Sequence, residues 1–249
     1  MTARRLGQHF LSDPTILARI ADALGARPGE SVIEIGPGHG ALTRELLARG
    51  LRVIAIEKDR GLAAALGPHD NLTVVTGDAL ELDWHRYGAD QVIGNIPYYI
   101  TSPLIDQALA PPIPKRVVFL VQDEVADRIA AKPGGKTFGA LSVGVQARCR
   151  VEKLFTVAPG AFRPPPKVKS ALLRLTPLAE PLVGPDDVAA LRRFVTACFS
   201  RRRKQLHNAV PGATAASLTA LGFDPQSRPE TLAPADFVRL LRWSRENVK

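Results

Sequence analysis

The sequence predicts an α/β fold, in which a mostly parallel sheet is covered by helices and is followed by a small all-helical domain. Short runs rich in Val and Ile alternate with amphipathic segments from residue 31 to about residue 131. This alternation is typical of a parallel sheet buried on both faces. Beyond residue 185 the pattern is helical only. The 249 residues suffice for one large domain or for a domain with a small appendage.

Seven strands are expected in the sheet. The first five are apolar, rich in Val and Ile, and bounded by turn residues, and they cover 31–35, 52–56, 72–75, 91–93 and 116–121. After Ala140 the rhythm changes, and strands are expected at 151–157 and 170–175. Two strands that close an otherwise parallel sheet indicate an antiparallel edge pair.

Helices are expected between the strands and after them. The first, over 14–24, begins at Ser12 or Asp13. The next four cover 41–49, 60–66, 102–109 and 123–131. The segment TPLAEPLVGP (176–185) is expected to be a linker, and four more helices cover 186–199, 201–210, 213–221 and 234–247. We therefore expect one domain over 1–180 and a helical domain over 181–249.

The charge of the chain indicates a polyanionic partner. The formal net charge is +9 and the sequence pI is about 10, so nucleic acid is the first candidate, although an arginine-rich proteome would also explain the excess. Cys149 and Cys198 have no metal-ligand spacing, which argues against a disulfide scaffold or a zinc site. No apolar run approaches the roughly 20 residues that cross a bilayer. We expect a cytoplasmic monomer without a metal.

A glycine-rich segment follows the first expected strand of the sheet. In VIEIGPGHGALT (32–43), Gly36, Gly38 and Gly40 allow the backbone to approach a ligand at a helix N-terminus. Alone, this pattern also fits a tight strand–helix connection. The next strand ends near Glu57, 21 positions after Gly36, a spacing that suits a carboxylate accepting the hydroxyls of a ribose. A solvated loop acid is the alternative for Glu57.

A third strand tip completes a candidate adenosine site. Asp78 follows the strand 72–75, where its carboxylate can accept a hydrogen bond from an adenine amino group. Open α/β sheets bind ligands at this carboxyl edge. A dinucleotide needs GxGxxG, whereas the spacing here is GxGxG. The acid Glu34 before the glycines suits a cationic methionine moiety, so we predict S-adenosylmethionine as the cofactor.

The fourth strand tip, QVIGNIPYYIT (91–101), lies beside the predicted sulfonium. Methyl transfer to an exocyclic aromatic amine requires the nitrogen to be held in line and its hydrogens to be accepted. The Asn95 side-chain oxygen and the carbonyl of Ile96 or Pro97 can accept them, and proline fixes the turn. Tyr98 offers a flat face to an extruded base. A capped strand end with packed tyrosines is the structural alternative.

Five segments of the chain resemble motifs of known enzymes. NIPY (95–98) resembles the motif of amino-methylating enzymes. Four further segments resemble the KsgA family of ribosomal RNA adenine dimethyltransferases: GQHFL (7–11), FRPPPKVKSALLRL (162–175), RRRKQLHNAV (201–210) and RPETLAPADFVRL (228–240). The resemblance implies a Rossmann-like class I S-adenosylmethionine-dependent methyltransferase domain and a helical domain. It also implies dimethylation of the N6 amino groups of two adjacent adenosines in the 3′-terminal hairpin loop of small-subunit (16S) rRNA.

The resemblance also assigns residues by motif match. Cofactor contacts are implied for His9, Leu11, Gly36, Gly38, Glu57, Asp78 and Asn95. Asn95, Pro97 and Tyr98 would hold the target adenine, with Phe162 stacking on its other face. Two residues depart from the family pattern: Lys169 stands where relatives are often acidic, and Tyr99 where many have Asn.

Basic residues near the predicted pocket form a candidate RNA-binding surface. No acid occurs from Val188 through Phe223. We expect phosphate contacts, which position RNA without reading its sequence, from Arg163, Lys167, Lys169, Arg201, Arg202, Arg203 and Lys204. The alternative for each is a solvated cation without an RNA contact.

Three rival functions remain open from the sequence. One is an Erm-type enzyme that dimethylates large-subunit rRNA, against which the triple proline and the R-P-E-x-L segment argue. Another is a non-catalytic ribosome-assembly or RNA-binding factor, against which the intact Glu57, Asp78 and NIPY argue. The third is a DNA adenine methyltransferase.

Overall fold

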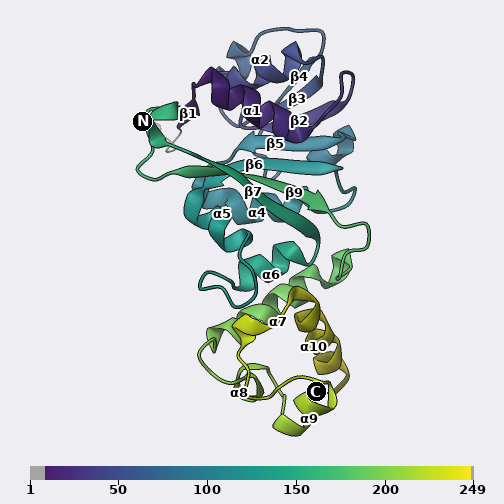
Figure 1. The fold of residues 1–249 in the computed structure, drawn as a ribbon. Coiled ribbons are helices and arrows are strands. Elements are labelled where there is room, and N and C mark those ends of the chain that lie inside the picture. The colour runs from purple at the N-terminus through teal and green to yellow at the C-terminus, as the bar shows by residue number, and fades with distance from the viewer. Residues whose placement is uncertain (1–8, 248–249) are drawn as a thin grey trace, which may run out of the picture. The chain divides into compact units, whose positions relative to one another are not determined.

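The computed structural model describes residues 9–247, which form two compact units (Figure 1). The first unit contains the residues up to Ala126 together with Glu152–Pro177. The second contains Asp127–Val151 and the residues from Leu178 onward. The sequence suggests a single boundary after residue 180, and that domain division stays a prediction. Residues 7 and 8 of the GQHFL segment lie outside the described part of the chain.

A seven-stranded sheet forms the first unit's framework, in the order β4-β3-β2-β5-β6-β9-β7. The first five strands of this order are parallel, β9 is antiparallel to β6, and β7 lies at the edge. This confirms the predicted mostly parallel sheet. The strands are β2 (Ser31–Ile35), β3 (Arg52–Glu57), β4 (Leu72–Thr76), β5 (Gln91–Asn95), β6 (Arg116–Gln122), β7 (Cys149–Val157) and β9 (Ser170–Pro177).

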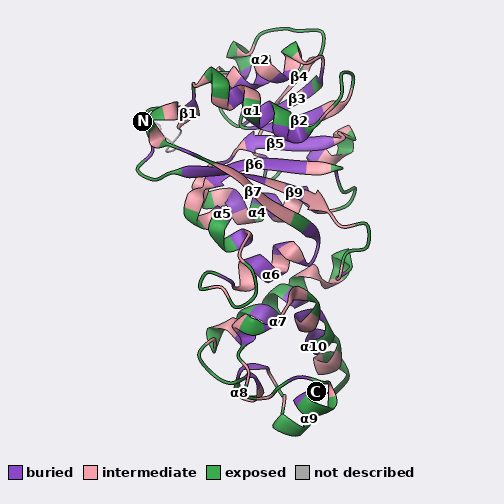
Figure 2. Cartoon of the chain, in the orientation of Figure 1, coloured by how far each residue is buried: buried purple, intermediate pink, exposed green. Residues whose placement is uncertain are grey.

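Helices cover the sheet at the predicted places. Asp13 caps α1 by accepting hydrogen bonds from the backbone of Thr15 and Ile16, and Gly25 ends the helix in the left-handed conformation. β5 and β6 are almost entirely buried (Figure 2), because helices pack on both faces. The helices of this unit are α1 (Pro14–Leu24), α2 (Ala41–Ala48), α3 (Arg60–Ala65), α4 (Thr101–Ala108) and, for its first residues, α5 (Asp123–Ile129).

The second unit has an apolar core of its own, which includes Phe138, Phe194, Leu206 and Phe237. Its elements include α6 (Ala140–Gln146), α7 (Val188–Ser200), α8 (Leu206–Ala209), α9 (Ala215–Ala220) and α10 (Pro234–Asn247). Among the described residues, no helix is long and apolar enough to cross a membrane.

Two features of the second unit differ from the prediction. The helix expected over 201–210 is wrong, since residues 201–204 form turns and only Leu206–Ala209 is helical. In these turns Arg202 donates hydrogen bonds to Glu230 and to the carbonyl of Gly135. Helix α6 was not expected, because its seven residues are too few to show a clear period.

A buried acid lies in the central strand β2. Glu34 is 2% exposed, and its Oε2 atom has no hydrogen-bond partner among the described residues. Burial raises the pKa of Glu34 to about 7; the nearby Thr43 hydroxyl and Arg44 oppose this shift, and the charge of Glu57 adds to it. Glu34 therefore carries a proton in the fold at pH values where a free carboxyl would be ionised.

Substitution of Gly94 by Ala should destabilise the sheet. A Cβ atom at this position would lie 2.7 Å from the Ile35 carbonyl oxygen and 2.8 Å from Ile96 Cδ1. Overpacking of this kind costs about 1–3 kcal/mol, which urea denaturation would measure. The matched control is Gly144→Ala in α6, where nothing lies within 4 Å of the added atom. That variant should gain roughly 0.5–1 kcal/mol from helix propensity, and equal losses in both variants would contradict the packing argument.

Substitution of Glu34 by Gln should change how stability depends on pH. Because the pKa is raised from 4.5 to about 7, the folded state binds a proton that the unfolded state has lost, so the parent protein loses stability as pH rises through this window. Removing the ionisation should make the variant more stable relative to the parent by on the order of 3 kcal/mol above pH 7, and by much less below pH 4.5. Denaturation series at several pH values measure this. The exposed Glu246→Gln control should stay within about 0.5 kcal/mol of the parent, and a pH-independent difference for Glu34→Gln would contradict the assignment.

Candidate active site

The carboxyl ends of the parallel strands line one cavity in the first unit. Parallel pairing of β2 with β3 and β5, and of β3 with β4, brings their ends to the same edge of the sheet. The structure brings together at this cavity eight residues that the sequence predicts for the site: His9, Gly36, Gly38, Glu57, Asp78, Asn95, Pro97 and Tyr98.

The glycine turn is packed closely under the N-terminal segment. Gly38 has a φ of +57°, and a Cβ atom there would lie 2.8 Å from the ring of Phe10. Its backbone N–H donates to Glu57 Oε2 at 3.0 Å. A side chain at this position would therefore be strained and would also displace Phe10.

Glu57 is held rigidly at the tip of β3. It is 4% exposed, and its two carboxylate oxygens accept the backbone N–H groups of Gly38 and Asp59, at 3.0 and 2.9 Å. Each oxygen keeps a second lone pair. The carboxylate can thus accept the hydroxyls of a ribose in the cavity without giving up the bonds that orient it.

Asp78 has a cationic neighbour that the sequence did not predict. Lys58 Nζ lies 2.6 Å from Asp78 Oδ2, while Oδ1 accepts the backbone N–H of Leu80 at 3.0 Å. The hydrogen bond from Lys58 lowers the pKa of Asp78, and the same bond raises the pKa of Lys58. An adenine amino group would have to share this carboxylate with Lys58.

The amide of Asn95 has a defined orientation. Its Nδ2 atom donates to the backbone carbonyl of His9 at 2.9 Å, which leaves Oδ1 as the acceptor for a ligand. The Pro97 carbonyl accepts the N–H of Ile100 at 3.1 Å. Of the two carbonyls that the sequence suggests for the second contact with an amine, that of Ile96 is therefore the better candidate.

The Tyr98 side chain, which also lines the cavity, is held by two contacts. Its hydroxyl and Ser170 Oγ are 3.0 Å apart, and its ring is stacked on His9 with centroids 6.3 Å apart. His9 is itself fixed by a 2.9 Å hydrogen bond between Nδ1 and the carbonyl oxygen of Pro164. Contacts with Ser170 and with His9 thus position the Tyr98 ring, and its role as a face for a base stays a prediction.

The structure does not bring Phe162 to this cavity. Strands β1 (Phe10–Leu11) and β8 (Phe162–Arg163) pair as a small antiparallel sheet, which the sequence did not predict. Phe162 is 1% exposed and packs with Leu11, Leu17 and Ile20 in the apolar core. The prediction that it stacks on the target base is corrected, because the ring is more favourably buried in this cluster. Leu11 likewise lines a smaller neighbouring cavity, together with Glu34.

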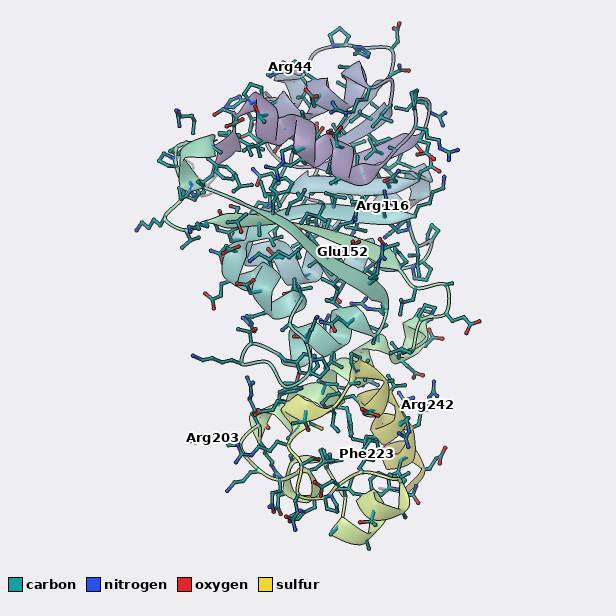
Figure 3. All side chains as sticks on the ribbon, in the orientation of Figure 1. Arg44, Arg116, Glu152, Arg203, Phe223 and Arg242 are labelled. Atoms are coloured by element: carbon teal, nitrogen blue, oxygen red, sulfur yellow. The ribbon has the colours of Figure 1, made fainter. Side chains whose placement is uncertain are left out.

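The predicted RNA-binding residues fall into two groups, one in each unit. Arg163, Lys167 and Lys169 are exposed in the first unit, and Arg201, Arg203 and Lys204 are exposed in the second, where Figure 3 labels Arg203. Arg202 differs from these, since its guanidinium pairs with Glu230 at 2.6 Å. The charge of Arg202 is therefore compensated within the second unit.

The sequence did not indicate some of the residues that line the cavity. Phe10, Lys58 and Tyr99 all line it, and Tyr99 is 67% exposed. Their positions in the sequence could have indicated them, because each directly follows a predicted site residue: His9, Glu57 and Tyr98.

The hydrogen-bond acceptors that line these cavities fit an adenosine derivative with a cationic end. Two carboxylates at neighbouring strand tips, Glu57 and Asp78, can accept hydrogen bonds from a ribose and from an adenine amino group. The adjoining smaller cavity contains Glu34, whose Oε2 atom lacks a partner among the described residues. Within residues 9–247 no group of three His, Cys, Asp or Glu residues could hold a metal ion.

The chain is similar along almost its whole length to proteins of one family. The model of the ribosomal RNA adenine dimethylase family matches residues 2–246. The ribosomal RNA small subunit methyltransferase A of Pseudomonas aeruginosa is 44% identical over 247 residues, covering 95% of this chain and 92% of that protein. The protein of the same name from Nitrosococcus oceani is 44% identical, covering 96% and 95%.

Two solved structures share the fold over nearly the whole chain. A dimethyladenosine transferase from Plasmodium falciparum has a TM-score of 0.84 and 29% identity, covering 96% of this chain and 98% of that one. The 23S rRNA methyltransferase ErmE has a TM-score of 0.69 and 30% identity, covering 94% and 98%. With the fold of the methyltransferases and a family match along almost its full length, this chain belongs to the ribosomal RNA adenine dimethylase family.

Proposed function

We propose that the protein uses S-adenosylmethionine to dimethylate the N6 amino groups of two adjacent adenosines in the 3′-terminal hairpin loop of small-subunit rRNA. The observation that carries the proposal is the Asn95 amide, whose nitrogen is bound to the His9 carbonyl so that its oxygen is left for an amine. The names of the relatives that are 44% identical support the small subunit as the substrate.

The residues of the cavity divide into two sets. Glu57 and Asp78 would hold the adenosine part of the cofactor, and Glu34 faces the adjoining cavity where a cationic amino-acid moiety would fit. S-Adenosylmethionine supplies an electrophilic methyl group when it is bound. Asn95, Ile96 and Tyr98 would then hold the target adenine.

The chemical task of the second set is positioning and electron localisation. The N6 lone pair of adenine is delocalised into the ring, and acceptance of both N–H groups by Asn95 Oδ1 and the Ile96 carbonyl favours a nucleophilic nitrogen. The same acceptors stabilise the positive charge that develops on nitrogen during transfer. Tyr98, fixed by Ser170 and His9, gives the base a flat face that restricts its orientation.

The direct test is methyl transfer from radiolabelled S-adenosylmethionine to four acceptors: unmethylated small subunits, large-subunit rRNA, duplex DNA and no nucleic acid. We expect label as dimethyladenosine on the small subunit only. Label on large-subunit RNA would instead support an Erm-type enzyme, and label on DNA a DNA adenine methyltransferase. RNA binding without any transfer would support a non-catalytic assembly factor.

Substitution of Asn95 by Ala should remove catalysis and keep binding. Loss of one preorganised group of this kind lowers kcat by on the order of 100-fold or more, because both the amine acceptor and the bond to His9 disappear. Single-turnover transfer and equilibrium binding to small subunits are measured side by side. The exposed Asn71→Ala variant is the control and should behave as the parent does. If Asn95→Ala lost RNA binding as well, the residue would have a different role.

A further inference from the structure

A third hollow of the first unit shares Phe10 as a lining residue with the candidate active site and with the smaller cavity beside it. Phe10 lines both the active-site cavity and this open groove, whose volume is about 540 Å³. The groove is bordered by α2 on one side and by the β1–β8 pair on the other, and its wall includes Arg44, Arg163 and His39. Arg44, which Figure 3 labels, lies in α2.

The two arginines of the groove are held by carbonyl groups. Arg44 Nη1 donates to the carbonyl of His39 at 2.9 Å. Arg163 Nη1 donates to the carbonyls of Gly160 and Phe162, both at 3.0 Å. A guanidinium has five N–H donors, so each side chain is oriented by the backbone and still has most of its donors directed elsewhere.

The positive charges of the groove are not balanced by its acid. Within the described chain, neither Arg44 nor Arg163 forms an ion pair with a carboxylate. Glu45 also borders the groove, but its carboxylate is paired with Arg49. The imidazole of His39 packs on Phe10, with ring centroids 4.3 Å apart, and is exposed. An exposed groove with two oriented, uncompensated guanidinium groups is suited to a phosphate.

We propose that this groove binds a backbone phosphate of the RNA substrate, with Arg44 and Arg163 as the charged contacts and His39 at the wall. The inference rests on the proposed function, since it assumes that a base enters the cavity beside Asn95. The backbone of an extruded nucleotide would stay outside that cavity, and the groove shares Phe10 with the cavity as a lining residue. Arg44 and His39 would thus add to the RNA-binding residues that the sequence indicates.

The test is the salt dependence of binding to unmethylated small subunits, measured for the parent, Arg44→Gln and Arg163→Gln. Each lost phosphate contact should reduce the slope of log K against log [salt] by about 0.7–0.9 and weaken binding at low salt. The matched control is Arg60→Gln at the start of α3, an exposed arginine of the same unit that does not border the groove. Arg44→Lys keeps the charge and should keep most of the slope.

Two further measurements make the outcome unambiguous. The affinity for S-adenosylmethionine should be unchanged in Arg163→Gln and in Arg44→Lys, which keeps the charge that acts on Glu34. This separates an RNA contact from damage to the cavity. If Arg44→Gln and Arg163→Gln lose no more slope than Arg60→Gln does, or if they lose transfer while their slope is unchanged, the groove is not a phosphate site. Binding does not require turnover, so this result is independent of the proposed reaction: a parent protein that binds subunits but transfers no methyl group would refute only the catalytic proposal.

Discussion

The parallel pairing of β2 with β3 on one side and β5 on the other is the constraint on which the site depends. It fixes Gly36, Glu57 and Asn95 at one edge of the sheet, although they come from three separate segments of the chain. The close approach of Gly94 to the carbonyl of Ile35 shows how little space separates β5 from β2. Small changes in strand spacing there would move Glu57 and Asn95 relative to each other.

Most of the fold and much of the cavity could be predicted because both follow from local patterns. The strands β2 to β6 are apolar runs that end in chemically distinctive residues. A carboxylate or amide directly after a buried parallel strand lies at the carboxyl edge of the sheet. The same reasoning failed for Phe162, because the pattern identifies a loop beside prolines but does not show that β8 pairs with β1 and buries the ring. Pairings between two-residue strands leave no periodicity in the sequence.

The sequence shows where basic residues occur, but it does not show which of them are paired with acids in the folded chain. The acid-free stretch of the second unit is visible in the sequence, yet it does not show that Arg202 is neutralised by Glu230, 28 positions later. Conversely, Arg44 looks like an ordinary helix-surface residue in the sequence. Its position beside Arg163 on one groove results from tertiary structure. The number of basic residues therefore says less about RNA contacts than the partners that each of them already has.

The bond between the Asn95 amide and the His9 carbonyl joins residues 86 positions apart, and the bond that fixes His9 to Pro164 spans 155 positions. Closure of such long loops carries an entropic cost, and short terminal pairings are among the first parts of a protein to open. The geometry around Asn95 is thus completed by long-range contacts outside the sheet. Mild denaturant should uncouple the amide from its support while the sheet remains folded, so loss of turnover would precede global unfolding and would report on how firmly the N-terminal segment is attached.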